Sequence, residues 1–268
     1  MQLPVLADSG GMIIYDGPSM LDGSHIVVIA TGIKRTSRNK KTGKAIQTWI
    51  LSATQNPMES HAEGNDTSIC GDCKHRYFGS CYVNLAHGPH NVYEAYKRGS
   101  YNHAVPAALE FFRNKFIRFG SYGDPAAVPA SIWQSLTSVA SGWTGYTHQW
   151  RNIDSAYKSF CMASCDTERE AERARANGWK PFLVLGAGDD VPDHYFICPA
   201  SEEAGKRLDC ERCGACAGGE LKHANQGTPA IYHHGASFKR VKYTNGMKRI
   251  RQKKGYRGVN VGAYAGVG

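Results

Sequence analysis

Nine cysteines in three clusters constrain this chain more than any other feature of its sequence. Three stand at positions 70, 73 and 81, two at 161 and 165, and four at 198, 210, 213 and 216. A secreted disulfide scaffold is normally shorter than 268 residues and carries an even number of cysteines. The N-terminal segment also lacks the basic start and long apolar run of a secretory signal. We therefore expect a cytoplasmic protein whose reduced thiols bind metal.

The strongest single motif is Cys210-x2-Cys213-x2-Cys216. This spacing is typical of ferredoxin-type loops, in which three thiolates reach three irons of a cubane cluster. Cys198, at the end of a predicted strand, would supply the fourth thiolate and close the site. Zinc sites more often combine two separated C-x2-C pairs. The motif predicts a [4Fe–4S] cluster first, with zinc as the alternative metal.

A second candidate site consists of Cys70, Cys73 and Cys81. Three thiolates without an obvious fourth can hold a [4Fe–4S] cluster with one open iron, which could bind a substrate or S-adenosylmethionine. Alternatively a fourth ligand completes the site, and the candidates are Cys161, Cys165, His75, His87 and His90. A structural zinc site with three cysteines and one histidine is a further reading. Cys165 is the stronger of the paired cysteines because it is nearer a predicted strand end, although lone cysteines are often buried core residues.

The N-terminal third predicts a β-hairpin followed by a cysteine-rich loop and two helices. The apolar runs at 24–33 and 45–53 read as strands joined by a polar, basic turn. Residues 56–81 read as a loop. Helices are predicted at 89–98, which begins with proline and stops before glycine, and at 105–115.

From residue 115 onward, short apolar runs alternate with helical patterns. Helices are predicted at 128–140 and at 167–178, where Thr167 and Glu170 form a capping box. Six strands are predicted, at 115–125, 144–150, 159–166, 181–190, 194–201 and 229–235. This alternation favours the α/β class with parallel strands. Because a full eight-unit barrel needs ~250 residues, we expect a partial (β/α)6 TIM-like barrel. The expected domains are an N-terminal hairpin extension (1–60), the cysteine-rich barrel (61–235) and a basic C-terminal tail (236–268).

Polar residues follow the predicted strands, where the active sites of β/α barrels gather. The candidate catalytic residues are Asp124, His148, Asp166, His233 and His234. Gly186 and Gly188, in a glycine-rich turn, are candidates for binding the ribose or methionine carboxylate of a cofactor. The turn lacks the spacing of a dinucleotide fingerprint.

The net charge of +9 is concentrated in two segments. Residues 221–268 contain ten lysines or arginines and no acid, and loop 34–44 contains six more basic residues. Basic residues interleaved with Phe238, Tyr243 and Tyr256 suit phosphate contact and base stacking, so nucleic acid is a candidate partner of tail 238–257 and loop 34–44. The alternative hypothesis is that this tail and this loop are solvated and bind no partner. No run of 18 apolar residues exists, and we expect no membrane span.

Five stretches resemble a group of uncharacterised bacteriophage-encoded, cysteine-rich proteins thought to share the radical S-adenosylmethionine barrel. They lie at 70–89, 119–129, 145–150, 160–166 and 197–219. The resemblance implies a partial barrel with one iron–sulfur cluster on Cys70, Cys73 and Cys81 and an auxiliary cluster on the other four cysteines. The chain departs from the C-x3-C-x2-C signature of radical enzymes, because its own spacing is C-x2-C-x7-C. The group implies no particular reaction.

Three hypotheses follow for the function. The first is an iron–sulfur protein on a partial barrel, with an enzymatic role left open between redox and S-adenosylmethionine chemistry. The second is a nucleic-acid-binding protein with structural zinc or iron–sulfur sites. The third is a zinc-stabilised structural or virion-associated protein.

Overall fold

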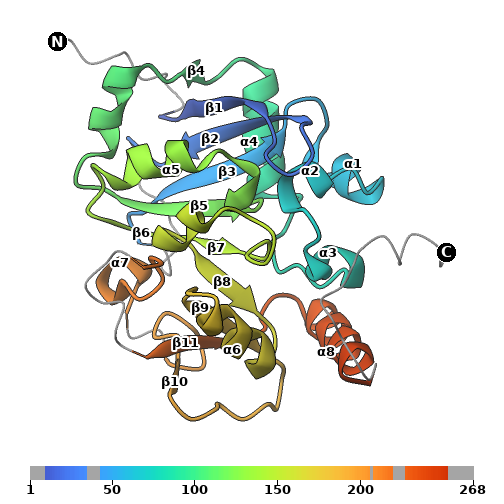
Figure 1. The fold of residues 1–268 in the computed structure, drawn as a ribbon. Helices are drawn as coiled ribbons and strands as arrows, with labels where there is room; N and C mark the ends of the chain where they lie inside the picture. Colours follow the sequence, from blue (N-terminus) through green and yellow to red (C-terminus); the bar gives the residue numbers. More distant parts are fainter. Residues whose placement is uncertain (1–9, 35–42, 206–207, 220–226, 253–268) are drawn as a thin grey trace.

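The computed structural model describes residues 10–34, 43–205, 208–219 and 227–252, whose strands form two sheets (Figure 1). The strand order is β4-β1-β2-β3-β5-β6 in the first sheet and β10-β11-β9-β8-β7 in the second. The first sheet contains β1 (Met12–Pro18), β2 (His25–Thr31), β3 (Ile46–Ser52), β4 (Asn102–His103), β5 (Phe116–Tyr122) and β6 (Gly142–Thr144). The second contains β7 (Tyr146–Thr147), β8 (Met162–Cys165), β9 (Pro181–Leu185), β10 (Tyr195–Ile197) and β11 (Thr228–Tyr232).

The two sheets are joined through consecutive residues, because only Gly145 separates β6 from β7 (Figure 1). Strands β3, β5 and β6 pair in parallel, and so do β7, β8, β9, β11 and β10. A Cβ on Gly145 would lie 2.9 Å from the Phe160 carbonyl oxygen and 3.0 Å from the Cys161 sulfur. The residue at this junction must therefore be small. The chain is a mixed α/β protein with mostly parallel strands.

Each of the six strands predicted after residue 115 is present, as β5 and β7 to β11. The predicted helices appear as α4 (Gly88–Lys97), α5 (Ala130–Thr137) and α6 (Glu168–Ala176). Helix α6 begins as expected, since the Thr167 hydroxyl accepts a hydrogen bond from the Glu170 backbone N–H at 3.1 Å. The segment predicted as a helix at 105–115 forms a 3-10 helix, Pro106–Phe112, and shorter 3-10 helices span Pro125–Ala127 and Ser155–Ser159.

The expectation of a loop at 56–81 is wrong. This segment forms three short helices, α1 (Pro57–Ala62), α2 (Thr67–Cys70) and α3 (Lys74–Phe78). Gly71 and Gly79, with φ of 56° and 60°, end α2 and α3 after about one turn. Helices this short cannot display an apolar period in the sequence, which is why the pattern reads as a loop.

The predicted hairpin is present as β2 and β3, which pair antiparallel. Sequence reasoning missed β1, which pairs antiparallel with β2. Because β3 also pairs in parallel with β5, the hairpin and the first predicted barrel strand belong to one sheet.

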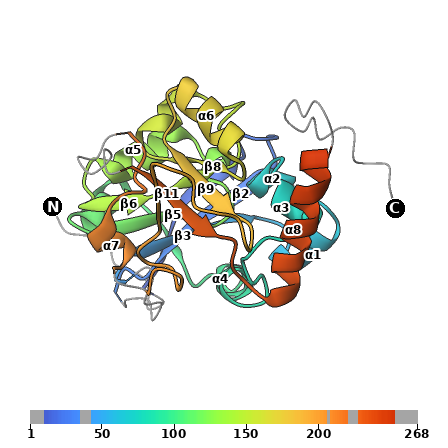
Figure 2. The ribbon, with the colours of Figure 1, turned by 90° about the horizontal axis from the view of Figure 1, so that it is seen from below.

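Part of the basic C-terminal segment forms helix α8 (Ser237–Gln252), which lies beside α3 (Figure 2). Its buried residues are Tyr243, Met247 and Ile250, at the spacing of one helical face. Gly246 permits close approach to α3, because a Cβ there would lie 2.5 Å from the Phe78 ring. Residues 253–268 lie outside the described part of the chain.

Within the described segments, no helix combines the length and apolar character needed to cross a bilayer.

Candidate functional site

A pocket of about 410 Å³ is lined by residues from six parallel strands and from both large cysteine clusters. Alternate residues of a strand point to the same side, and the lining follows that alternation along β9 and along β6 and β7, whereas Gly120, Ser121 and Tyr122 of β5 all line the pocket. The strand-derived lining residues include Arg118, Gly120 and Tyr122 of β5, Thr144, Tyr146 and His148 along β6 and β7, Ser164 of β8, Phe182 and Val184 of β9, and Ile231 and His233 at β11.

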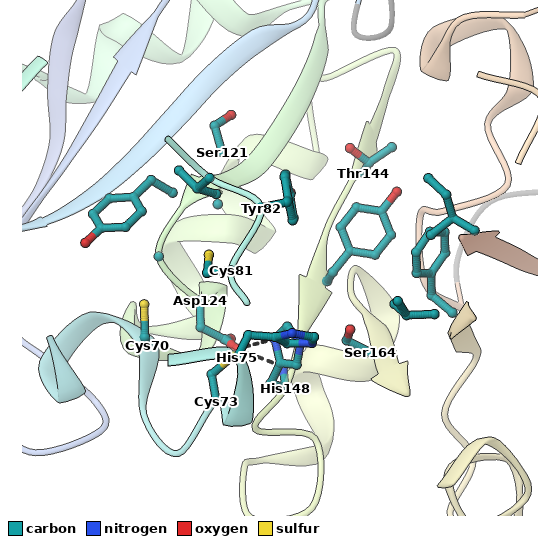
Figure 3. A pocket seen from close by; sticks show the side chains of 18 of the residues that line it. Cys70, Cys73, His75, Cys81, Tyr82, Ser121, Asp124, Thr144, His148 and Ser164 are labelled. Atoms are coloured by element: carbon teal, nitrogen blue, oxygen red, sulfur yellow. Dashed lines mark hydrogen bonds and ion pairs between the residues drawn. The ribbon is translucent and has the colours of Figure 1, made fainter. Parts of the chain in front are cut away.

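Cys70, Cys73 and Cys81 all line this pocket (Figure 3). Cys70 ends α2, and Cys73 is the residue before α3. Burial raises the pKa of the Cys70 thiol, and the charges of Cys73 and Cys81 raise it further, so the three thiols are electrostatic neighbours. Gly71 is required between the first two, because its φ is 56° and a Cβ there would lie 2.5 Å from the Gln149 side chain.

Backbone N–H groups donate hydrogen bonds to three of the cysteine sulfurs. Burial raises the pKa of Cys73, and a hydrogen bond from the His75 N–H lowers it. Burial likewise raises the pKa of Cys81, and a hydrogen bond from the Val83 N–H lowers it. Cys213 receives the same kind of bond from Ala215, two residues further along the chain. Such donors stabilise thiolates, and hydrogen bonds to sulfur are a standard feature of iron–sulfur sites.

The other predicted group, Cys198, Cys210, Cys213 and Cys216, is also brought together. Burial is the main cause that raises the pKa of Cys216, and the charges of the other three thiols add to it. The Tyr146 hydroxyl opposes this shift by donating a hydrogen bond to the Cys216 sulfur. Cys210 begins the short helix α7 (Cys210–Cys213) and lines the pocket. The loop is tied to the sheet junction, since the Gly145 N–H donates to the Cys216 carbonyl at 3.2 Å.

Cys161 and Cys165 join neither group. They lie on the same side of the chain, as their spacing predicts, but both belong to the main apolar core, whereas Ser164 between them faces the pocket. Burial raises the pKa of Cys165, and the charges that add to it come from Glu170 and Asp166 rather than from a thiol. Among the histidines considered as a fourth ligand, His75 lines the pocket, while His87 and His90 do not.

Asp124, His148 and His233 lie within two residues of the ends of β5, β7 and β11 and line the pocket, as predicted for the carboxyl ends of parallel strands. The His148 backbone N–H donates to the Asp124 carboxylate at 2.8 Å (Figure 3). Burial raises the pKa of Asp124 to about 6 and lowers the pKa of His148 to about 3. At neutral pH the site therefore presents an acid close to its titration range beside an uncharged imidazole.

His233 and His234 lie where α8 meets the pocket. The His233 ring stacks on Tyr243 of α8, with 4.3 Å between ring centroids, and its Nε2 lies 2.8 Å from the Ser80 carbonyl oxygen. Burial and the charge of His75 lower the pKa of His233 to about 4. The His234 ring lies 4.8 Å from Tyr82 at the pocket. Helix α8 thus supports the pocket wall.

Asp166, a predicted catalytic residue, is instead the centre of a buried ion network and does not line the pocket. The Lys74 ammonium lies 2.7 Å from the Asp166 carboxylate and 3.0 Å from that of Glu170, which Arg151 contacts at 2.8 Å. Burial would raise the pKa of Asp166, but Lys74 and His75 hold it well below its usual range. The network anchors α3, and with it the cysteine loop, to α6.

Gly186 and Gly188, predicted to contact a cofactor, also lie off the pocket. The Gly186 N–H donates to the Asp189 carboxylate at 2.9 Å, so this turn closes on its own side chain. Sequence reasoning conversely missed Arg118, Tyr82 and Tyr146, which line the pocket. A signal was present for Arg118, since it is a charged residue within the otherwise apolar run of β5.

Within the described residues, no three His, Cys, Asp or Glu side chains are arranged to hold a single metal ion. A tetrahedral zinc site with Zn–S bonds of about 2.3 Å holds its sulfurs about 3.8 Å apart. A cubane spaces its ligands more widely, because each thiolate binds a different iron. The all-thiol donor sets and their N–H donors fit such a cluster.

No protein-family model matches the chain, and the searches of curated proteins and solved structures found nothing similar. The resemblance to the phage proteins therefore stays a prediction, and the function has to be argued from the site.

Proposed function

We propose that this chain is an iron–sulfur protein with two [4Fe–4S] clusters. Cys70, Cys73 and Cys81 would hold one cluster and leave its fourth iron open to the pocket. Cys198, Cys210, Cys213 and Cys216 would hold a second cluster with no open iron. The observation that carries the proposal is the gathering of seven of the nine cysteines into two all-thiol groups, of which Cys70, Cys73, Cys81 and Cys210 line the pocket.

A buried hydroxyl supports a bound group at the first site. The Tyr122 hydroxyl has no hydrogen-bond partner among the described residues, and the charges of Cys70 and Cys81 act on it. Burying an unpaired hydroxyl costs free energy. A group held by these thiols would lie where it could interact with that hydroxyl.

The architecture we propose is the partial (β/α)6 barrel. Its support is that β5, β6, β7, β8, β9 and β11 all line one pocket, with alternate residues of β9 and of the β6–β7 segment facing it, as in the interior of a β/α barrel. Both cysteine groups would then open into the barrel interior.

The pocket residues suit an enzyme of redox or S-adenosylmethionine type. A cluster with an open iron would supply electrons or bind a substrate or cofactor directly. Asp124, with a pKa of about 6, can accept or donate a proton near neutral pH. His148 stays neutral and can hydrogen-bond a bound molecule without adding charge.

Anaerobic purification with iron, sulfide and zinc analysis tests the proposal. We expect a brown protein with about eight irons and eight sulfides per chain, as two cubanes require. A visible absorption spectrum on the same sample confirms that the iron belongs to clusters. A colourless protein with one or two zinc ions per chain, prepared under the same anaerobic conditions, would overturn it in favour of structural zinc.

Nucleic-acid binding is a second candidate function, and the solvent-exposed face of α8 favours it. This face carries Arg240, Lys242, Lys248 and Arg249, and α8 contains no acidic residue. Phe238 and Val241 on the same helix are 56% and 59% exposed. Cations interleaved with exposed apolar groups suit phosphate contact and base stacking. Most of loop 34–44, the other predicted contact, lies outside the described residues.

Fluorescence anisotropy with a labelled single-stranded oligonucleotide tests this second function. Replacing Lys242, Lys248 and Arg249 by glutamine is expected to weaken binding and to reduce the slope of log affinity against log salt by about 2. Replacing Arg169 and Arg173, exposed on α6, is the matched control and should leave both unchanged. Equal losses in both variants would mean that only net charge matters, and no binding by the wild type would exclude the function.

A further inference from the structure

We propose that Arg118 is the anion-binding residue of the pocket, and that the molecule bound there carries a phosphate or carboxylate group. This inference deepens the proposed function because it names the substrate class of the same pocket. It does not require that either cysteine group hold iron.

Arg118 lies between the two cysteine groups. It is on β5, at a position whose side chain lines the pocket, and its Nη2 donates a hydrogen bond to the Tyr82 hydroxyl at 2.9 Å. Tyr82 follows Cys81 in the chain. On the other side, the guanidinium interacts electrostatically with Cys210 of the second group and with Tyr146, which donates a hydrogen bond to Cys216 of that group.

No carboxylate of the described residues pairs with Arg118. Asp124 is the one acid among the described residues that line the pocket, and its oxygens accept hydrogen bonds from the backbone N–H groups of Ala126 and His148, at 3.0 and 2.8 Å. Other partly buried arginines are paired, since Arg151 contacts Glu170 and Arg76 contacts Asp66. Arg118 thus differs from them in keeping its charge without an acidic partner.

A guanidinium in a pocket without an acidic partner is suited to an anionic ligand. It offers five N–H donors in a planar fork that matches carboxylate and phosphate oxygens. In the part of the chain that the structure describes, one of these donors is used, by Tyr82. A cation removed from water costs free energy unless it is paired, and a bound anion would offset that cost.

The pocket volume of about 410 Å³ falls in the range of small-molecule sites. A mononucleotide or a small aromatic acid is therefore a suitable probe. Two matched pairs isolate the charge: adenosine 5′-monophosphate against adenosine, and benzoate against benzamide.

Calorimetric titration of the anaerobically purified, full-length protein with these four probes tests the inference. In the wild type, we expect the charged member of at least one pair to bind roughly tenfold more tightly than its neutral partner. The preferred pair distinguishes a phosphate-bearing from a carboxylate-bearing ligand. Arg118→Gln should abolish the preference, and Arg118→Lys, which keeps the charge but not the fork, should retain part of it. Circular dichroism and metal analysis of each variant monitor folding and cluster content.

Two results would overturn the inference. One is a wild type that prefers neither charged probe. The other is a preference that persists in Arg118→Gln, because a different group would then hold the anion. If that variant also lost metal, Arg118 would be a counter-charge for the thiolates. A metal-free wild type that still prefers the charged probe would support the anion site while refuting the two clusters, so the two proposals fail separately.

Discussion

Replacing Cys70, Cys73 and Cys81 together by serine is expected to remove about half of the iron and sulfide and to leave the other half in place. The physical reason is that the two groups use different thiols, which the fold holds on separate segments. The first group lies around α2 and α3, and the second lies around α7, which is apart from α2 and α3 in both views (Figures 1 and 2). Replacing Cys198, Cys210, Cys213 and Cys216 should remove the other half. Iron and sulfide analysis of anaerobically purified protein measures both results.

Cys165→Ser is the matched control for these variants. Cys165 is buried in the apolar core, its hydrogen bond goes to the Ala163 carbonyl, and no other thiol acts on it. The variant should keep the full iron content of the wild type. If one triple or quadruple variant lost all metal, the two groups could not be independent sites. If Cys165→Ser lost half, the thiol would be a ligand and the assignment of the first site would be wrong.

Most strands of this fold, though not β1, β4 and β6, were predictable because their signal is local. Each of β5, β8 and β9 is a short apolar run bounded by glycine, proline or acid, and such runs are read directly from the sequence. The order of the strands was not predictable in the same way. Strand β10 precedes β11 in the chain but pairs beyond it at the sheet edge, and that choice depends on contacts between distant residues.

The cysteine groups were predictable for a different reason, namely that their ligands are close together in sequence. Cys210, Cys213 and Cys216 occupy one loop, and so do Cys70 and Cys73. The remaining site residues depend on which way a strand faces. Cys165 and Asp166 stand at a strand end, yet the first faces the core and the second forms an ion pair with Lys74. Only the register of β8 decides which of its side chains face the core and which face the pocket, and a shift of one residue would exchange the two sets.

Arg118 and Tyr146 are pocket residues that a search of strand ends does not find. Neither follows a strand, so a search of strand ends passes over them. They reach the pocket because they occupy inward positions within β5 and β7. A polar side chain inside an apolar run is the signal that could have identified them, since such a residue needs a partner once it is buried.

Lys74→Met is expected to lower the free energy of unfolding by about 3–5 kcal/mol, the cost of removing one member of a buried ion pair, and it leaves His75, 3.2 Å from the Asp166 carboxylate, as the remaining partner. The Asp166 side chain is fully buried, and Lys74 is its closest cation, at 2.7 Å. Methionine keeps most of the aliphatic volume, so the change is mainly one of charge. The measurement is urea denaturation of the anaerobically purified protein, followed by tryptophan fluorescence.

Two further variants separate the cost of the buried charge from other effects of Lys74→Met. Asp166→Asn in the Lys74→Met background removes the buried carboxylate that has lost its lysine partner and should recover part of the lost stability. Arg113→Met breaks the pair between Arg113 and Glu110, which is exposed at both ends, and should shift the urea midpoint much less. Equal shifts for Lys74→Met and Arg113→Met would contradict the prediction, because the buried network would then contribute no more than a surface pair. Lys74 follows Cys73 directly, so the ion network also positions the first cysteine group. If Lys74→Met lost both stability and the iron of the first group but kept the iron of the second group, this network would explain the result.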